Sequence, residues 1–255
     1  MDNNVDDDNN AVNDHIVRYA PDGMTDQRPH PPDGMTDQRP YPPDGMTDQR
    51  PHPPDGMTDQ RPYHHGNLRT ALLEQAQLTV RERGVEQLSL RDLARQVGVS
   101  HGAPRRHFAD RQALLDALAQ AGFERLGSEL RAAVGAAGDG FEDRLRATAG
   151  AYIHFATEDA DLLELMFAGK HRDPTGALNE AAERAFAVML DLITQGQGNG
   201  ALQRGDPERV GLVLFATIQG IAALVTAGMV DPDQVDALAA DATAYFLRGS
   251  RPAAS

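Results

Sequence analysis

The sequence predicts an all-α protein, and three observations lead to this fold class. Apolar residues recur at the helical spacing i, i+3, i+4 and i+7 from residue 67 onward. Ser or Asp residues suited to N-capping precede these stretches, and glycines follow several of them. Alternating apolar and polar residues, which are typical of half-buried strands, form no convincing stretch. We therefore expect a helical protein preceded by a tail of different composition.

The tail, residues 1–63, carries a repeat. The unit PDGMTDQRP[HY]P begins at Pro21, Pro32, Pro43 and Pro54, a period of 11 residues. Its prolines exclude a continuous helix, and Met is its only sizeable invariant apolar residue, so it cannot bury enough surface to offset backbone ordering. We predict a disordered tail. A functional tail would bind a partner or use its acidic charge to oppose non-specific DNA binding. The alternative is a duplicated segment without function, and a plausible start of the protein at Met57 favours this alternative.

Charge is distributed unevenly along the chain. The formal charge of the chain is −14, yet residues 64–126 hold 7 acids and 9 bases and are slightly basic. The flanking segments are acidic: residues 1–63 hold 13 acids and 5 bases, and residues 127–255 hold 18 acids and 10 bases. A polyanion would bind this basic segment.

The absence of cysteine excludes a disulfide, a thiolate zinc site and a Cys nucleophile. The first ten residues do not form a secretory signal, and no apolar run approaches a membrane span of roughly 18 residues. We expect a soluble, cytoplasmic protein without a membrane partner.

Two helices are expected directly after the tail. The first starts at Asn67 and ends at Gly84, which is suited to the C′ position. Its apolar stripe consists of Leu68, Leu72, Ala76, Thr79 and Val80. The second starts at Ser89, which has capping-box spacing to Asp92, and ends at Gly98. Its apolar residues are Leu90, Leu93, Ala94 and Val97.

A third, short helix is predicted between Ser100 and Phe108, so that residues 89–108 have the spacing of a helix-turn-helix motif. Ser100 is the expected N-cap, and Pro104 is tolerated because it forfeits only the first intrahelical bond. Small residues here let the backbone approach base edges, and arginines bind guanine or phosphate oxygens through their fork geometry. This pattern favours DNA binding over a merely solvated charged face. The projecting residues are His101, Gly102, Arg105 and Arg106.

The rest of the chain is also predicted to be helical. Asp110 caps a longer helix that continues through Leu126. Three Asp-Pro pairs each place an N-capping side chain before a proline suited to the first helical position. These pairs are Asp173-Pro174, Asp206-Pro207 and Asp231-Pro232. Glycine-rich breaks are expected at residues 135–140 and 196–200.

The stretches YHHGNLRTALLEQA and LSLRDLARQVGVSHGAPRRHFADRQALLDAL, within Tyr63–Leu118, resemble the DNA-binding domain of the TetR family of bacterial transcriptional regulators. Ala151–Phe167 and Ile218-Gln219-Gly220 resemble, more loosely, the ligand domain of one subgroup that carries a Trp-His-Gly signature. The resemblance implies a homodimer on a palindromic DNA operator and a small-molecule effector that releases it, as in a repressor. It divides the chain into the tail at 1–63, a helix-turn-helix domain at 64–111 and an effector-binding and dimerisation domain at 112–250.

The resemblance also assigns DNA-contacting residues. Ser89 would cap the second helix and touch a phosphate, and residues 101–107 would enter the groove. Arg105 stands where the family usually has a phosphate-binding Tyr, so it either holds that phosphate or contacts a base. Arg111 replaces a phosphate-binding Lys. The full expected set is Asn67, Arg69, Ser89, Arg91, Ser100, His101, Gly102, Ala103, Arg105, Arg106, His107 and Arg111.

The middle helices supply the expected effector surface. Ordinary burial in the core is the alternative for each apolar member, and the ligand interpretation rests on the resemblance and on the deformability of Met-lined surfaces. His154 fits an effector contact and a hydrogen-bonded core histidine equally well, and Gln219 has the same ambiguity. The full expected set is Tyr152, His154, Phe155, Met166, Phe167, Phe186, Met189 and Gln219.

The last two helices, expected at residues 207–228 and 232–248, are the predicted dimer interface. The first is apolar nearly all round, which indicates burial on several sides, and its small residues permit close helix approach. Two such helices from each subunit would form an isologous four-helix interface. Burial within one subunit is the alternative.

No cofactor, metal site or catalytic site is expected. The pairs His64-His65 and His101 with His107 have no carboxylates at ligand spacing. No Ser-His-Asp arrangement, phosphate loop or paired-carboxylate motif is recognisable, so an enzyme is not expected. Two other classes stay open besides a regulator. One is an all-α small-molecule binding protein without DNA-binding activity, which the unusual Arg105 keeps open, and the other is a helical enzyme whose site is assembled by folding.

Overall fold

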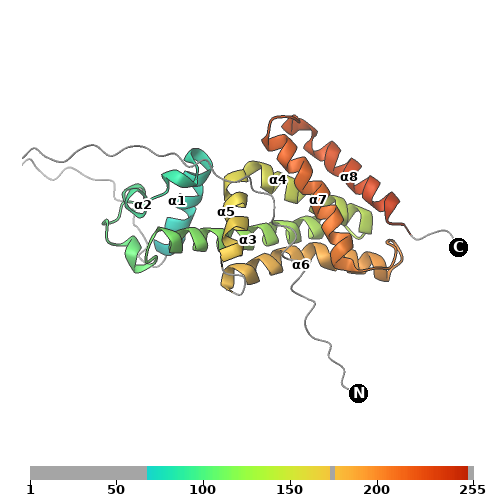
Figure 1. Cartoon of the computed structure of the whole chain (residues 1–255), viewed down its shortest axis with the longest axis horizontal. Coiled ribbons are helices and arrows are strands. Elements are labelled where there is room, and N and C mark those ends of the chain that lie inside the picture. Colours follow the sequence, from blue (N-terminus) through green and yellow to red (C-terminus); the bar gives the residue numbers. More distant parts are fainter. Residues whose placement is uncertain (1–67, 173–175, 252–255) are drawn as a thin grey trace, which may run out of the picture. The chain divides into compact units, whose positions relative to one another are not determined.

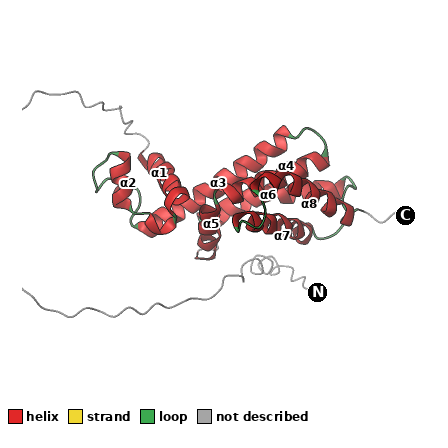
Figure 2. Cartoon of the chain, turned by 90° about the horizontal axis from the view of Figure 1, so that it is seen from above, coloured by secondary structure: helices red, strands yellow, loops and turns green. Residues whose placement is uncertain are grey.

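The computed structural model describes residues 68–172 and 176–251, and it confirms the all-α fold class over these ranges. Eight α-helices and three short 3₁₀ helices occur there, with no strand among the described residues (Figures 1 and 2). The repeat tail, His64-His65, Asn67 and Asp173-Pro174 lie outside the described residues. The α-helices are α1 (Leu68–Arg83), α2 (Leu90–Val97), α3 (Arg111–Ala136), α4 (Phe141–Glu158), α5 (Ala160–Arg172), α6 (Ala177–Gly198), α7 (Pro207–Thr226) and α8 (Val235–Gly249).

The first two helices have the predicted bounds because their capping residues act as expected. Gly84 follows α1 with a positive φ of 80°, and Gly98 ends α2 in the left-handed region at φ 77°. The Ser89 hydroxyl accepts a hydrogen bond from the backbone N–H of Asp92 at 3.1 Å and donates to the Asp92 carboxylate at 2.7 Å. These contacts satisfy a backbone donor that the first turn of α2 would otherwise leave unpaired.

Replacing Ser89 with alanine is expected to lower the free energy of unfolding by about 1 kcal/mol, because the α2 N-terminus loses its side-chain cap. The measurement is equilibrium unfolding in urea followed by circular dichroism. Ser100→Ala is the matched control, since Ser100 is exposed and the following short helix has no side-chain cap. Equal losses in the two variants would contradict the capping role.

The third helix differs from its prediction. In place of an α-helix over residues 100–108, the chain forms a 3₁₀ helix, η3 (Pro104–Arg106), between turns. The Ser100 carbonyl accepts from the Ala103 N–H at 2.9 Å, and the Pro104 carbonyl accepts from the His107 N–H at 2.9 Å. Pro104 has no N–H for the bond that would start an α-helix, so i→i+3 bonds close the turns instead. The prediction that Ser100 caps a helix and that Pro104 leaves it intact is therefore wrong.

Helix α3 organises the rest of the fold. It is 26 residues long and begins at Asp110, whose carboxylate accepts from the Ala113 N–H at 2.8 Å. In both views α1 and α2 lie near its first turns, while α7 and α8 lie toward its other end (Figures 1 and 2). Helices α4, α5 and α6 pack along its length and share one continuous apolar core with it.

The remaining helix starts agree with the Asp-Pro predictions where the residues are described. The Asp206 carboxylate accepts from the Glu208 and Arg209 N–H groups, with Pro207 as the first residue of α7. Asp231 accepts from the Asp233 N–H, but the helix it opens is a 3₁₀ helix, η4 (Pro232–Gln234), that leads into α8. The breaks between α3 and α4 and between α6 and α7 occur as expected, but they lie at residues 137–140 and 199–206, because α3 continues to Ala136 and α6 to Gly198.

Candidate nucleic-acid interface and aromatic core

Helix α2 and η3 form a compact corner on α1. Ala94 of α2 and Pro104 of η3 are buried, and Phe108 closes the corner at 2% exposure. The small side chain of Ala94 lets α2 and η3 approach each other closely, and the ring of Pro104 packs inward. The corner therefore buries its apolar side chains and turns the residues around Pro104 to solvent.

Residues 100–107, which we call the recognition segment, present most of the predicted DNA-contacting side chains. Arg105 and Arg106 are exposed, and neither makes an ion pair with another described residue. The other exposed members are Ser100, His101, Gly102 and His107, while Ala103 is half-buried. Arg91 on α2 is exposed as well. These residues bring two guanidinium groups without ion-pair partners in residues 68–172 and 176–251, and a small-residue backbone, to one end of the corner.

Two further predicted DNA contacts are engaged within the protein. The Arg111 guanidinium donates from Nε to the Leu88 carbonyl at 3.0 Å and from Nη2 to the Val85 carbonyl at 2.7 Å. Arg111 thus holds the loop before α2 while its side chain remains exposed, and its phosphate contact stays a prediction. Arg69 lies 5.6 Å from the centre of the Phe108 ring, a cation–π contact that places it beside the corner.

Five rings form an aromatic cluster in the core: Phe123, Tyr152, Phe167, Phe186 and Phe215. They come from five different helices, α3 to α7. Phe186 and Phe215 meet edge to face at 5.2 Å between centroids, and Phe167 stacks on Phe186 at 6.3 Å. Such pairs add directional contacts to area burial, so the cluster links the five helices at one place.

Tyr152 and Gln219 supply a polar pair at the edge of this cluster. The Tyr152 hydroxyl donates to Gln219 Oε1, and burial raises the pKa of that hydroxyl well above its usual value. Tyr152 is fully buried, and Gln219 is half-buried on α7. The two residues were predicted separately as effector contacts, and the structure brings them together.

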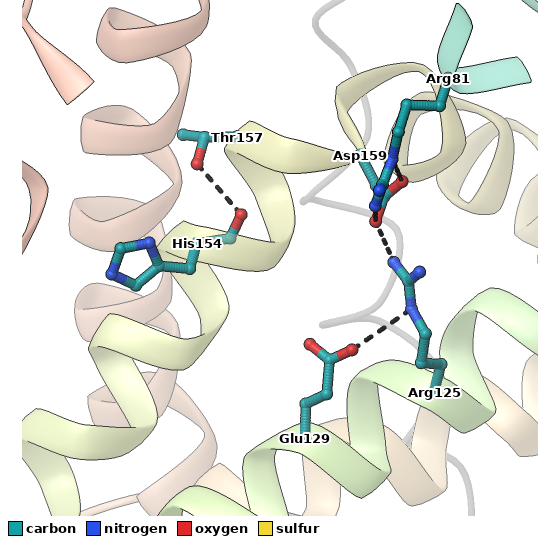
Figure 3. Close-up of polar contacts among 6 residues, drawn as sticks. All are labelled: Arg81, Arg125, Glu129, His154, Thr157 and Asp159. Atoms are coloured by element: carbon teal, nitrogen blue, oxygen red, sulfur yellow. Dashed lines mark hydrogen bonds and ion pairs between the residues drawn. The ribbon is translucent and has the colours of Figure 1, made fainter. Parts of the chain in front are cut away.

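His154 lies elsewhere. Its side chain is 48% exposed, and Nε2 is 2.8 Å from Asp236 Oδ1 at the start of α8. Figure 3 shows the ring pointing away from the α4–α5 junction. The alternative of a core histidine is therefore wrong, and the side chain does not join the aromatic cluster.

The other predicted effector residues are buried or, in Phe167 and Phe186, half-buried, and they are not all in the cluster. The Arg125 guanidinium carbon lies 4.5 Å from the centre of the Phe155 ring, so that Phe155 packs under this guanidinium. Met166 contacts Gly122 of α3. Met166 and Met189 are buried core residues. Sequence reasoning missed Phe123, although it lies four residues after Ala119 on the buried stripe of α3. It also missed Phe215, which was assigned only to the dimer helix.

A buried carboxylate joins α1, α3 and the α4–α5 junction (Figure 3). Asp159 is 3% exposed, and its two oxygens accept from Arg81 Nε at 2.9 Å and Nη2 at 2.7 Å. Arg125 Nη2 donates to the same carboxylate, and Arg125 Nε lies 3.4 Å from Glu129 Oε1 without hydrogen-bond geometry. We call Asp159 with Arg81 and Arg125 the carboxylate bridge. Sequence analysis did not identify it.

The bridge favours the ionised form of Asp159. Burial by itself would raise the pKa of Asp159, but the hydrogen bonds and charges of Arg81 and Arg125 outweigh burial and lower it. Partial burial raises the pKa of Glu129 against the attraction of Arg125. Because the Asp159 pKa is depressed on folding, its contribution to stability is present above about pH 4 and is lost as the pH falls through the folded value.

A small cleft lies beside the bridge. Its volume is about 150 Å³, and its lining consists of Val80, Arg81 and residues Thr157–Leu162. Separately, no group of three or more His, Cys, Asp or Glu side chains in residues 68–172 and 176–251 is placed to hold a metal ion.

Comparisons with known protein families match two separate parts of the chain. Residues 72–118 match the family described as bacterial regulatory proteins, tetR family, and residues 145–246 match the tetracyclin repressor-like C-terminal domain. Together the matched ranges cover more than half of the sequence. The first contains the corner and recognition segment, and the second contains the polar pair and α7. Comparison with curated proteins gave no match.

Solved structures show the same fold. A protein of unknown function from Rhodococcus sp. RHA1 is 44% identical, with a TM-score of 0.70, over 76% of this chain and 100% of that one. The TetR family transcriptional regulator PfmR from Thermus thermophilus is 19% identical, with a TM-score of 0.55, over 69% of this chain and 97% of that one. The fatty acid degradation regulator FadR from Bacillus halodurans is 19% identical, with a TM-score of 0.57, over 72% and 100%.

Proposed function

The chain belongs to the TetR family and is a DNA-binding transcriptional regulator, and from this premise we propose that it acts as a homodimeric repressor on a palindromic operator, from which a small-molecule effector releases it. In this proposal residues 64–111 bind DNA in the cytoplasm, and residues 112–250 bind the effector and the second subunit. The observation that carries the proposal is the recognition segment, where Arg105 and Arg106 stand exposed and without ion pairs among the described residues.

The DNA-binding surface follows from the geometry of the corner. A 3₁₀ turn of three residues cannot present a long helical face to the major groove, so the contacts concentrate at its ends. We assign Arg105 and Arg106 to phosphate or guanine oxygens, and His101, Gly102 and Ala103 to close backbone approach. Arg91, Ser89, Asn67, Arg69 and Arg111 are assigned to flanking phosphates, and Arg69 and Arg111 also support the corner through their contacts with Phe108 and with the Val85 and Leu88 carbonyls.

The dimer is supported by helix α7. The length and composition of α7 would allow it to cross a membrane, although no membrane span was expected from the sequence. Only 22% of its most apolar stretch is buried in the described protein. Val213 is 61% exposed and Leu224 is 41% exposed. The small residues Ala216, Gly220, Ala223 and Ala227 are exposed on the same helix. They fall on one stripe at helical spacing, which a second copy of α7 can approach closely.

We assign the effector site to the aromatic cluster and its polar pair. The rings provide apolar surface from five helices, and Tyr152 with Gln219 provides a donor and an acceptor that can be exchanged for contacts with a ligand. Helix α7 carries both Gln219 and the exposed stripe, so a ligand at the polar pair would act directly on the helix that meets the second subunit.

Salt-dependent binding to DNA from upstream of the chain's own gene tests the proposal. We expect affinity for the operator to fall on the order of 10³-fold between about 50 and 200 mM salt, because each phosphate contact releases counterions. A scrambled duplex of equal composition serves as the control and should bind far more weakly at every salt concentration. Binding that is absent, or that does not distinguish the two duplexes, would favour a helical small-molecule binding protein without DNA-binding activity.

A further inference from the structure

The carboxylate bridge occupies a position that the proposed function does not explain. Asp159 separates α4 from α5, and its side chain is almost completely buried. A buried carboxylate is stable only when it is paired, and here both partners come from other helices. Few other arrangements can satisfy it, so the α4–α5 junction has one well-defined position relative to α1 and α3.

The two arms of the bridge reach the two functional regions. Arg81 lies in the last turn of α1, the helix on which α2 and η3 pack. Arg125 lies on α3, two residues after Phe123 of the aromatic cluster, and its guanidinium covers Phe155 of α4. The carboxylate is therefore a polar contact between the cluster side and the DNA-binding side of the molecule, in addition to the packing of α1 on α3 and α5.

The arms differ in exposure. The Arg125 side chain is 29% exposed and stacks on Phe155, whereas the Arg81 side chain is 45% exposed and lies beside the cleft of about 150 Å³. If the α4–α5 junction shifts, Arg81 is the arm that water reaches more readily in exchange for Asp159. Glu158 borders the same cleft and would attract the released guanidinium.

We propose that Asp159 is the positioning residue through which packing in the aromatic cluster sets the placement of α1, and with it the recognition segment. A change in the cluster moves the α4–α5 junction. The Arg81 guanidinium then either stays bound to Asp159, so that α1 moves with the junction, or releases the carboxylate. The DNA consequence rests on the proposed function, but the transmission from the cluster to α1 does not.

A double-mutant comparison in the full chain tests this role. Phe186→Leu changes the cluster without using an unidentified ligand, and Asp159→Asn removes the charge of the bridge at nearly constant volume. Asp161→Asn is the matched control, since it is exposed and borders the same cleft. The two readouts are amide hydrogen exchange of residues 76–83 in α1 and affinity for DNA selected by the unmodified protein from a random pool.

We expect Phe186→Leu to change both readouts by about 3- to 30-fold in the unmodified protein and in Asp161→Asn. In the Asp159→Asn background the same substitution should change them less than about 2-fold, because the contact that transmits the change is missing. A merely structural role for Asp159 would lower the unfolding temperature and leave the two effects additive.

Two outcomes would overturn the proposal. One is an equal effect of Phe186→Leu with and without Asp159, and the other is no effect on α1 exchange in the unmodified protein. If Asp159→Asn does not fold, Arg81→Gln replaces it, because this removes only the half-exposed arm. If no DNA is selected, the proposed function fails, and hydrogen exchange alone decides whether Asp159 transmits the change.

Discussion

Operator affinity is expected to fall by at least about 30-fold when Arg105 and Arg106 are both replaced with alanine, because each well-placed arginine contact contributes about 1–3 kcal/mol. Both side chains are exposed in the recognition segment and are not held by carboxylates of the described residues. Their loss leaves the corner without its two forked donors. Fluorescence anisotropy with a labelled operator at fixed salt measures the change.

The single variants separate the two kinds of contact. An arginine on a phosphate should weaken binding to all sequences alike and reduce the salt slope by about one, whereas an arginine on a base should relax specificity at one position. Arg146→Ala with Arg184→Ala is the matched control, since it removes equal charge from exposed helix surfaces. Equal losses in the two double variants would mean that net charge, and not the recognition segment, governs binding.

The second large effect is expected at α7. Replacing Val213 and Leu224 with glutamate should weaken the dimer by at least about 10³-fold, because each uncompensated charge in an apolar interface costs several kcal/mol. An isologous interface receives every substitution twice, so four carboxylates would face one another. Sedimentation velocity at micromolar concentration should then show a monomer, whereas the unmodified chain is expected to sediment as a dimer.

Leu78→Glu is the control for this change. Leu78 is 49% exposed, but it lies on α1, far along the chain from α7. This variant should remain dimeric. A dimer that survives both substitutions in α7 would place the interface elsewhere. A protein that is monomeric before substitution, and that partitions into lipid vesicles, would assign the exposed stripe of α7 to a membrane.

Sequence reasoning succeeded where the determinants are local. Ser89, Asp110 and Asp206 cap the helices that they were expected to cap, because a capping bond joins residues two or three positions apart. The apolar stripes of α1 and α2 were also correct, since helical spacing alone decides which side chains face the core.

The errors also have physical causes. Pro104 was judged by the one hydrogen bond that it removes, but this bond starts the helix, and short 3₁₀ bonds replace it. The bonds from Arg111 to the Val85 and Leu88 carbonyls were missed, because these carbonyls lie 26 and 23 residues away in the sequence. Asp159 could not have been predicted, because its partners lie 78 and 34 residues away in the sequence.

Helix α3 passes without interruption from Arg111, which holds the loop before α2, to Phe123 in the aromatic cluster. Twelve residues of α-helix make a stiff rod of about 18 Å. Rotating one end of this rod by about 10° swings the other by about 3 Å, close to the rise of one base pair. The carboxylate bridge joins Arg125 of this same helix to α1, so in the proposed dimer a small repacking around Phe123, transmitted through Asp159, would put the two subunits out of step with the helical pitch of their binding site.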